Sequence, residues 1–139
     1  MRRALSGKGA RASLSGAWSG VYSFPGDAQR PVAFSADLKQ AGAWIVGTTA
    51  EVAERGDARG ATISATLQGR RDGRRVTWLK LYDRLPQFYN EVAYVGQINE
   101  DATEISGQWS IPGNWSGAFL MIRTSTLTLA RRRVTVERL

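Results

Sequence analysis

The sequence of 139 residues contains no cysteine and no histidine. Without them, the chain cannot form disulfides, zinc sites built from thiolates and imidazoles, thiol nucleophiles or a catalytic triad that depends on histidine. Haem held by a proximal histidine is excluded for the same reason. We therefore predict neither a metal ion nor a cofactor.

Long apolar runs are also missing from the sequence. No segment approaches the roughly 18 apolar residues with which a helix spans a membrane. Residues 1–14 are basic, but they lack the apolar centre of an export signal. We interpret residues 1–14 as a flexible basic tail, expect no transmembrane segment, and take the cytoplasm as the default location.

Acidic residues are few compared with basic ones. The chain has 19 Lys+Arg against 12 Asp+Glu, a net charge of +7 and a pI of about 10.5. Besides the tail, the basic residues gather at Arg70–Arg75 and Arg131–Arg133. Basic clusters near aromatic residues raise the alternative of a nucleic-acid or protein-binding module. Because the aromatic residues are expected on an inner face, we interpret the clusters as solvated surface charge and do not expect a nucleic-acid partner.

From Ser15 onward, apolar residues alternate with period two, and turn residues such as Asp72-Gly73 interrupt the pattern about every 8–12 residues. This pattern predicts strands over residues 15–24, 32–40, 44–52, 61–70, 75–82, 91–99, 104–111 and 115–123. Short connections favour one all-β domain, residues 15–123, folded as an eight-stranded antiparallel up-and-down β-barrel. Residues 124–139 are expected to pack on the barrel as a C-terminal extension, either a strand or a short helix.

Gly16-Ala17-Trp18 opens the first expected strand, and Arg123 closes the last. In these features the sequence resembles the calycins, a group of β-barrels that includes lipocalins, fatty-acid-binding proteins and avidins. The resemblance implies that Trp18 packs beneath the Arg123 guanidinium and closes the barrel, an arrangement that cation–π attraction stabilises. Tryptophans 18, 78, 109 and 115 also fall in the expected strands much as avidin tryptophans do. A calycin-like barrel implies a ligand inside it.

Aromatic side chains dominate the expected inner face. An apolar interior with a few polar groups is typical of a ligand pocket, but it is equally typical of a filled core. The sequence leaves both interpretations open. If a pocket is present, we predict that its ligand contacts Tyr22, Phe34, Trp44, Trp78, Lys80, Tyr82, Tyr94 and Phe119.

Lys80 belongs to a strand that is apolar on both faces, so alternation does not fix its direction. Facing inward, the lysine would bind a ligand carboxylate or act as an amine nucleophile of lowered pKa. In the competing register, Leu79 and Leu81 face inward and Lys80 faces water. The carboxylates of Asp37, Glu51, Glu91 and Glu104 are expected on outward faces or at strand ends. No inward pair of acids is therefore predicted.

We predict that the protein holds a small hydrophobic or amphipathic molecule inside a β-barrel, and we expect binding rather than catalysis. An alternative is a barrel-type cyclase or isomerase in which a tyrosine or Lys80 assists proton transfer to an apolar substrate. The apolar loop 83–90 would be a lid over the barrel mouth or a plug of its end. A sheet edge or the segment 134–136 would support a homo-oligomer.

Overall fold

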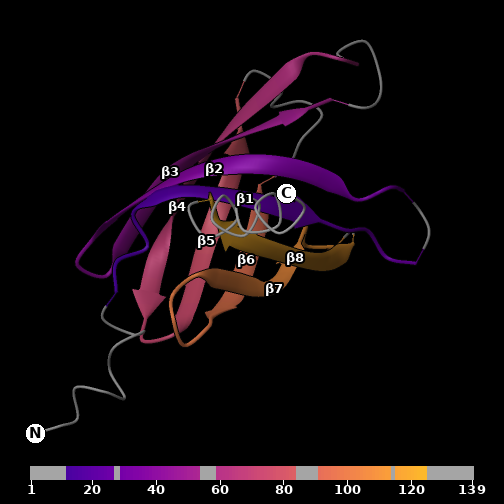
Figure 1. The fold of residues 1–139 in the computed structure, drawn as a ribbon. Coiled ribbons are helices and arrows are strands. Elements are labelled where there is room, and N and C mark those ends of the chain that lie inside the picture. Colours follow the sequence, from indigo (N-terminus) through magenta and orange to yellow (C-terminus); the bar gives the residue numbers. More distant parts are fainter. Residues whose placement is uncertain (1–11, 27–28, 54–58, 84–90, 114, 125–139) are drawn as a thin grey trace, which may run out of the picture.

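The computed structural model describes residues 12–26, 29–53, 59–83, 91–113 and 115–124. The sheet is a closed barrel in which the strands follow their order in the sequence (Figure 1). The strands are β1 Gly16–Tyr22, β2 Val32–Ala41, β3 Trp44–Val52, β4 Thr62–Asp72, β5 Arg75–Tyr82, β6 Val92–Ile98, β7 Glu104–Ser110 and β8 Ser116–Arg123. This architecture confirms the predicted eight-stranded up-and-down barrel.

Every neighbouring pair of strands is antiparallel, and the barrel closes where β1 meets β8. Trp18 lies opposite Arg123, and Tyr22 lies opposite Phe119, at the two ends of this closing ladder. Closure removes the free edges that an open sheet would expose to other chains. It also assigns each side chain of a strand to the interior or to the outer surface, because successive residues point to opposite faces.

Two glycines allow the strands to approach closely while the sheet coils. A Cβ atom added to Gly69 would lie 1.9 Å from the carbonyl oxygen of Thr77, and one added to Gly107 would lie 2.0 Å from that of Val95. Neither contact is tolerable for a real side chain. The two glycines therefore occupy places where the curvature of a closed sheet leaves no room for a Cβ atom.

One end of the barrel, here called the base, is closed by the ends of β1 and β8. The Arg123 guanidinium lies 4.5 Å from the centre of the Trp18 ring. It donates hydrogen bonds to the carbonyl oxygens of Ser13 and Ala102, while the Trp18 indole N–H donates to that of Leu14. The contact between Trp18 and Arg123 that the sequence predicted is therefore present.

The residues before β1 take part in this closure. Leu14 is fully buried beneath Trp18, and Arg71 donates a hydrogen bond to the carbonyl oxygen of Ala12. Residues 12–14 are therefore held by the barrel, which corrects the expectation of a flexible tail over residues 1–14. Residues 1–11, and all of the 124–139 extension except Thr124, lie outside the described residues. Among the residues that are described, no helix is long and apolar enough to cross a membrane.

Substitution of Arg123 tests the closure of the base. We expect Arg123→Ala to lower the free energy of unfolding by about 2–3 kcal/mol, because a charged donor to several carbonyls and its contact with Trp18 are lost together. Urea denaturation followed by tryptophan fluorescence measures the change. Arg75→Ala, at an exposed position beside the turn between β4 and β5, is the control and should leave the midpoint nearly unchanged. Equal effects of the two substitutions would contradict this account of the base.

Candidate functional site

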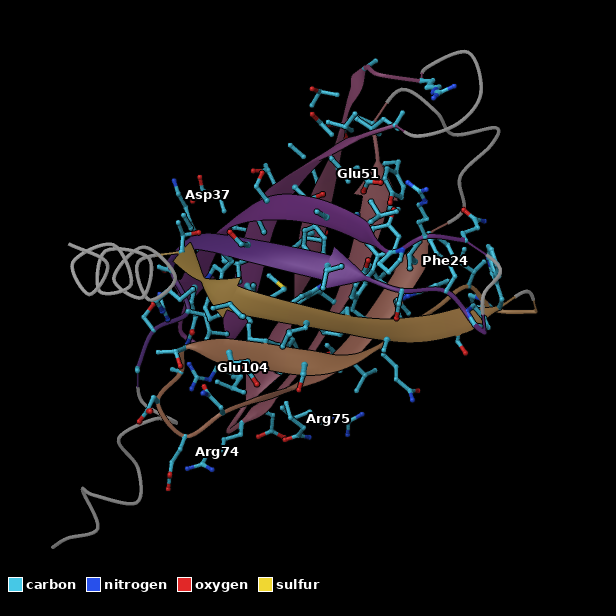
Figure 2. The ribbon with its side chains drawn as sticks, turned by 45° about the vertical axis from the view of Figure 1, so that its right-hand side comes forward. Phe24, Asp37, Glu51, Arg74, Arg75 and Glu104 are labelled. Carbon is cyan, nitrogen blue, oxygen red and sulfur yellow. The ribbon has the colours of Figure 1, made fainter. Side chains whose placement is uncertain are left out.

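A polar cluster lies inside the barrel near the end opposite the base. This second end, here called the loop end, is where β1, β3, β5 and β7 finish. Glu51 comes from the end of β3, Tyr22 from the end of β1, and Lys80 and Tyr82 from the end of β5. Figure 2 shows Glu51 toward one end of the barrel and Arg74 toward the other.

Three donors converge on the Glu51 carboxylate. The Lys80 ammonium lies 3.1 Å from Oε1 of Glu51, and the Tyr82 hydroxyl donates to the same oxygen at 3.0 Å. The Tyr22 hydroxyl donates to Oε2 at 2.6 Å. Lys80 is only 1% exposed, and Glu51 is also buried. Both charges are therefore neutralised inside the protein by hydrogen-bonded partners, as buried charges must be.

Aromatic rings surround the Lys80 ammonium on several sides. Its Nζ atom lies 4.7 Å from the ring centre of Tyr82, 5.0 Å from Tyr22, 5.2 Å from Phe34 and 5.9 Å from Tyr94. Rings at these distances attract a cation through the negative charge on their faces. They also exclude water, so the carboxylate and the rings together hold the ammonium.

Burial changes the proton affinities of the cluster. It raises the pKa values of Tyr22 and Tyr82 far above their usual value, and the nearby negative charge of Glu51 raises them further. Burial likewise raises the pKa of Tyr94, with a smaller effect from Glu51. For Lys80, burial lowers the pKa, and the Glu51 carboxylate partly opposes that shift. The tyrosines of the cluster are thus neutral hydrogen-bond donors over the whole physiological range.

Trp44 and Glu51 correct the predicted faces of β3. Trp44 was expected inside the barrel, but it is 62% exposed on the outer surface. Glu51 was expected on an outward face or at a strand end, but its side chain points into the interior and pairs with Lys80. Both errors have one cause, because a shift of one residue moves every side chain of a strand to the other face. Ile45, which is buried, marks the true inner series of β3.

The structure decides between the two registers of β5. Lys80 faces inward, whereas Leu79 and Leu81 are 41% and 43% exposed on the outer surface. The remaining predicted contact residues lie on the inner face or at its loop end. Phe34, Trp78, Tyr94 and Phe119 are buried, and Tyr22 and Tyr82 are half-buried. Contact between a ligand and these residues stays a prediction.

The interior beside Lys80 is nearly filled. The described side chains leave a void of about 10 Å³ there, lined by Phe34, Thr49, Leu67, Trp78, Lys80, Tyr94 and Met121. That volume suits about one water molecule, far below the several hundred Å³ of a typical ligand pocket. The Thr49 hydroxyl is buried without a hydrogen-bond partner among the described residues. A ligand of ordinary size does not fit into this void.

A second aromatic group lies at the loop end. The ring of Phe24 packs 5.6 Å from Tyr22, 5.5 Å from Trp109 and 5.0 Å from Trp115. The Trp109 indole N–H is fixed by donation to the carbonyl oxygen of Ser23. Phe24, Tyr22 and Trp115 are half-buried, so they form a partly open aromatic rim, labelled by Phe24 in Figure 2. Of the loop 83–90, only Asp83 is described, so its expected role as lid or plug lies outside the described residues.

Sequence reasoning did not include Glu51, Thr49 or Phe24 among the functional candidates. A charged residue near a strand end was taken as solvent-facing, although an inward lysine on a neighbouring part of the barrel would need such a partner. Comparison with protein-family models gives no match, and comparison with curated proteins gives no significant relative. The resemblance to calycins through Trp18 and Arg123 therefore stays a prediction.

A double-mutant cycle tests the pairing of Glu51 with Lys80. We expect Lys80→Met to lower the free energy of unfolding by about 3–5 kcal/mol, because it leaves a buried carboxylate without its cation. The double variant Glu51→Gln with Lys80→Met should recover much of that loss, as measured by urea denaturation at neutral pH. Lys39→Met, at an exposed position, is the matched control. If the effects of Glu51→Gln and Lys80→Met on the free energy of unfolding simply added in the double variant, the two residues would not be coupled.

The tyrosines of the cluster should resist ionisation. Tyr22, Tyr82 and Tyr94 have raised pKa values in the folded protein, whereas in the unfolded chain they ionise near 10.0. The folded protein holds more protons above that pH, so the free energy of unfolding should fall as the pH rises above about 10. Absorbance at 295 nm should show three tyrosines still protonated at about pH 11 until denaturant is added. Normal titration of all tyrosines in the folded protein would contradict the burial of these hydroxyls.

Proposed function

We propose that the protein binds a small amphipathic molecule at the loop end of its barrel. The observation that supports this proposal is the Glu51–Lys80 pair with its two tyrosines, set among aromatic rings beneath a partly open rim. A buried ion pair stabilises a fold no better than well-packed apolar side chains of the same volume. A barrel that needed only stability would therefore gain nothing from this cluster, whereas a binding site uses such groups to orient a ligand.

The hydrogen-bond directions suggest what the polar end of the ligand carries. Tyr22 has one hydroxyl hydrogen, and it is donated to Glu51. Toward a ligand the Tyr22 oxygen is then an acceptor. This arrangement favours a ligand with a hydroxyl or amine donor, whose apolar part would lie against Phe24 and Trp115. Deeper contacts with Phe34, Trp78, Lys80, Tyr94 and Phe119 would require these side chains to move, because the void between them is small.

Access supports the loop end rather than the base. At the base, Leu14 is fully buried, and Trp18 is covered by Arg123. At the loop end, the half-buried rings of Tyr22 and Tyr82 are the part of the polar cluster that reaches toward solvent. A calycin-like origin of the fold is part of the same proposal, supported by the contact between Trp18 and Arg123.

An enzyme of the isomerase or cyclase type is the second candidate. The observation that favours it is that one carboxylate accepts hydrogen bonds from an ammonium and two neutral hydroxyls in surroundings that exclude most water. Such a cluster holds a proton acceptor and proton donors within reach of one another, as proton-transfer catalysis requires. Chemical change of a bound ligand during incubation would favour this candidate over simple binding.

Native mass spectrometry tests the proposed binding. We expect purified protein to retain a small molecule under gentle conditions and to lose it on denaturation. Tyr22→Phe removes one hydroxyl from the site and should reduce the retained fraction, whereas Ser106→Ala on the outer surface should not. As a second probe, the dye 1-anilinonaphthalene-8-sulfonate should show a saturable rise in fluorescence that Tyr22→Phe weakens. A clean apo mass together with no saturable dye signal would contradict the proposal.

A further inference from the structure

Trp44 differs from the buried tryptophans of the barrel in its exposure. Trp18, Trp78 and Trp109 are each at most 3% exposed, whereas Trp44 is 62% exposed at the start of β3. Tryptophan is highly buried on average in proteins, so an exposed ring on a rigid strand is unusual. The large open area of the ring is available to a flat partner.

One cation lies against the exposed ring, and further cations lie at the same end of the barrel. Trp44 and Arg70 are directly opposite each other on β3 and β4, and the Arg70 guanidinium lies 5.1 Å from the ring centre. Three further cations are exposed at the same end of the barrel: Lys39 of β2, Arg74 of the turn between β4 and β5, and Arg75 at the start of β5. Figure 2 shows Arg74 and Arg75 at the end away from Glu51.

The surface next to the ring is a groove lined by one basic residue, one acidic residue and several uncharged ones. The cross-strand row Lys39, Val46, Gln68 and Leu79 lies beside the pair of Trp44 and Arg70. A groove of about 460 Å³ runs over the first three of these positions, and its lining also includes Asp37, Gly47, Thr48, Thr66 and Leu67. Asp72, an exposed acid at the same end of the barrel, is the register partner of Arg75. The chain as a whole keeps a net charge of +7.

We propose that this outer surface, formed by Lys39, Trp44, Val46, Gln68 and Arg70, binds single-stranded nucleic acid. One base would stack on Trp44, and the phosphates would be bound by Arg70 and the neighbouring cations. Single-strand binding proteins combine these two features, because every base has a flat face and every nucleotide has a negative charge. A nucleic-acid partner was not expected because the aromatic residues were placed inside the barrel, but Trp44 lies outside it.

Two observations favour a nucleic acid over other anionic partners. The sequence has only three lysines among its 19 basic residues, and the planar guanidinium of arginine matches phosphate oxygens in pairs. The ring projects from a strand of a closed sheet, so a strand of unpaired bases can lie along the groove. In a duplex, the base faces are hidden within the stack and could not reach Trp44.

Fluorescence anisotropy tests the proposal. The probe is a labelled single-stranded oligonucleotide of mixed sequence, about 12 nucleotides long, which is within the range of known single-strand sites. We expect saturable binding that weakens as salt rises from about 50 to 200 mM. Trp44→Ala should weaken binding about tenfold, and Trp44→Phe should restore part of the loss, because stacking depends on an aromatic ring. Circular dichroism of each variant verifies folding.

A matched arginine control separates this site from general attraction by a basic protein. Arg70→Ala and Arg30→Ala remove the same charge, but Arg30 is exposed in the connection between β1 and β2, near the loop end. Arg70→Ala should weaken binding about fivefold more than Arg30→Ala. Equal losses, unchanged binding by Trp44→Ala, or absence of binding at low salt would overturn the proposal. So would Trp44-dependent binding to phosphatidylserine vesicles without oligonucleotide binding. None of these results bears on ligand retention at the loop end.

Discussion

Closure of the sheet through the pairing of β1 with β8 is the constraint on which the rest of this structure depends. In a closed sheet, a polar side chain on the inner face cannot escape to solvent around an edge. Lys80 must therefore find its partners inside, and it finds them in the Glu51 carboxylate and the surrounding rings. The hydroxyls of Tyr22 and Tyr82 are further hydrogen-bond donors to the same carboxylate. The polar cluster is thus a direct outcome of placing one lysine on the inner face.

The sequence predicts the strands well because period-two alternation and strong turn residues are local signals. The expected strands agree with the observed ones to within two residues at each end. Trp18 and Arg123, which the resemblance to calycins placed in contact, are direct partners at one end of the closing ladder. Alternation fails where both faces of a strand are apolar. In β3 and β5, apolar residues occupy both faces of the strand. The pattern therefore predicts a strand but does not indicate which face points into the barrel.

The error in β3 has a larger effect than its single residue shift suggests. It moved Trp44 into the interior and Glu51 out of it, and so it hid both the partner of Lys80 and the exposed ring beside Arg70. Both residues belong to one strand, but their side chains lie on opposite faces and at opposite ends of the barrel. β3 therefore connects two chemically different surfaces, one inside the loop end and one outside the base, that can be altered separately.

The closing ladder also has a consequence for how the protein is made. The Arg123 guanidinium donates a hydrogen bond to the carbonyl oxygen of Ser15, a residue 108 positions earlier in the chain. During synthesis, β1 leaves the ribosome first, and its outer edge stays unpaired until β8 has been translated. Loop closure over such a separation is entropically unfavourable, so sealing the barrel is expected to be slow compared with forming its hairpins. Until then, the open edge of β1 is free to pair with strands of other chains.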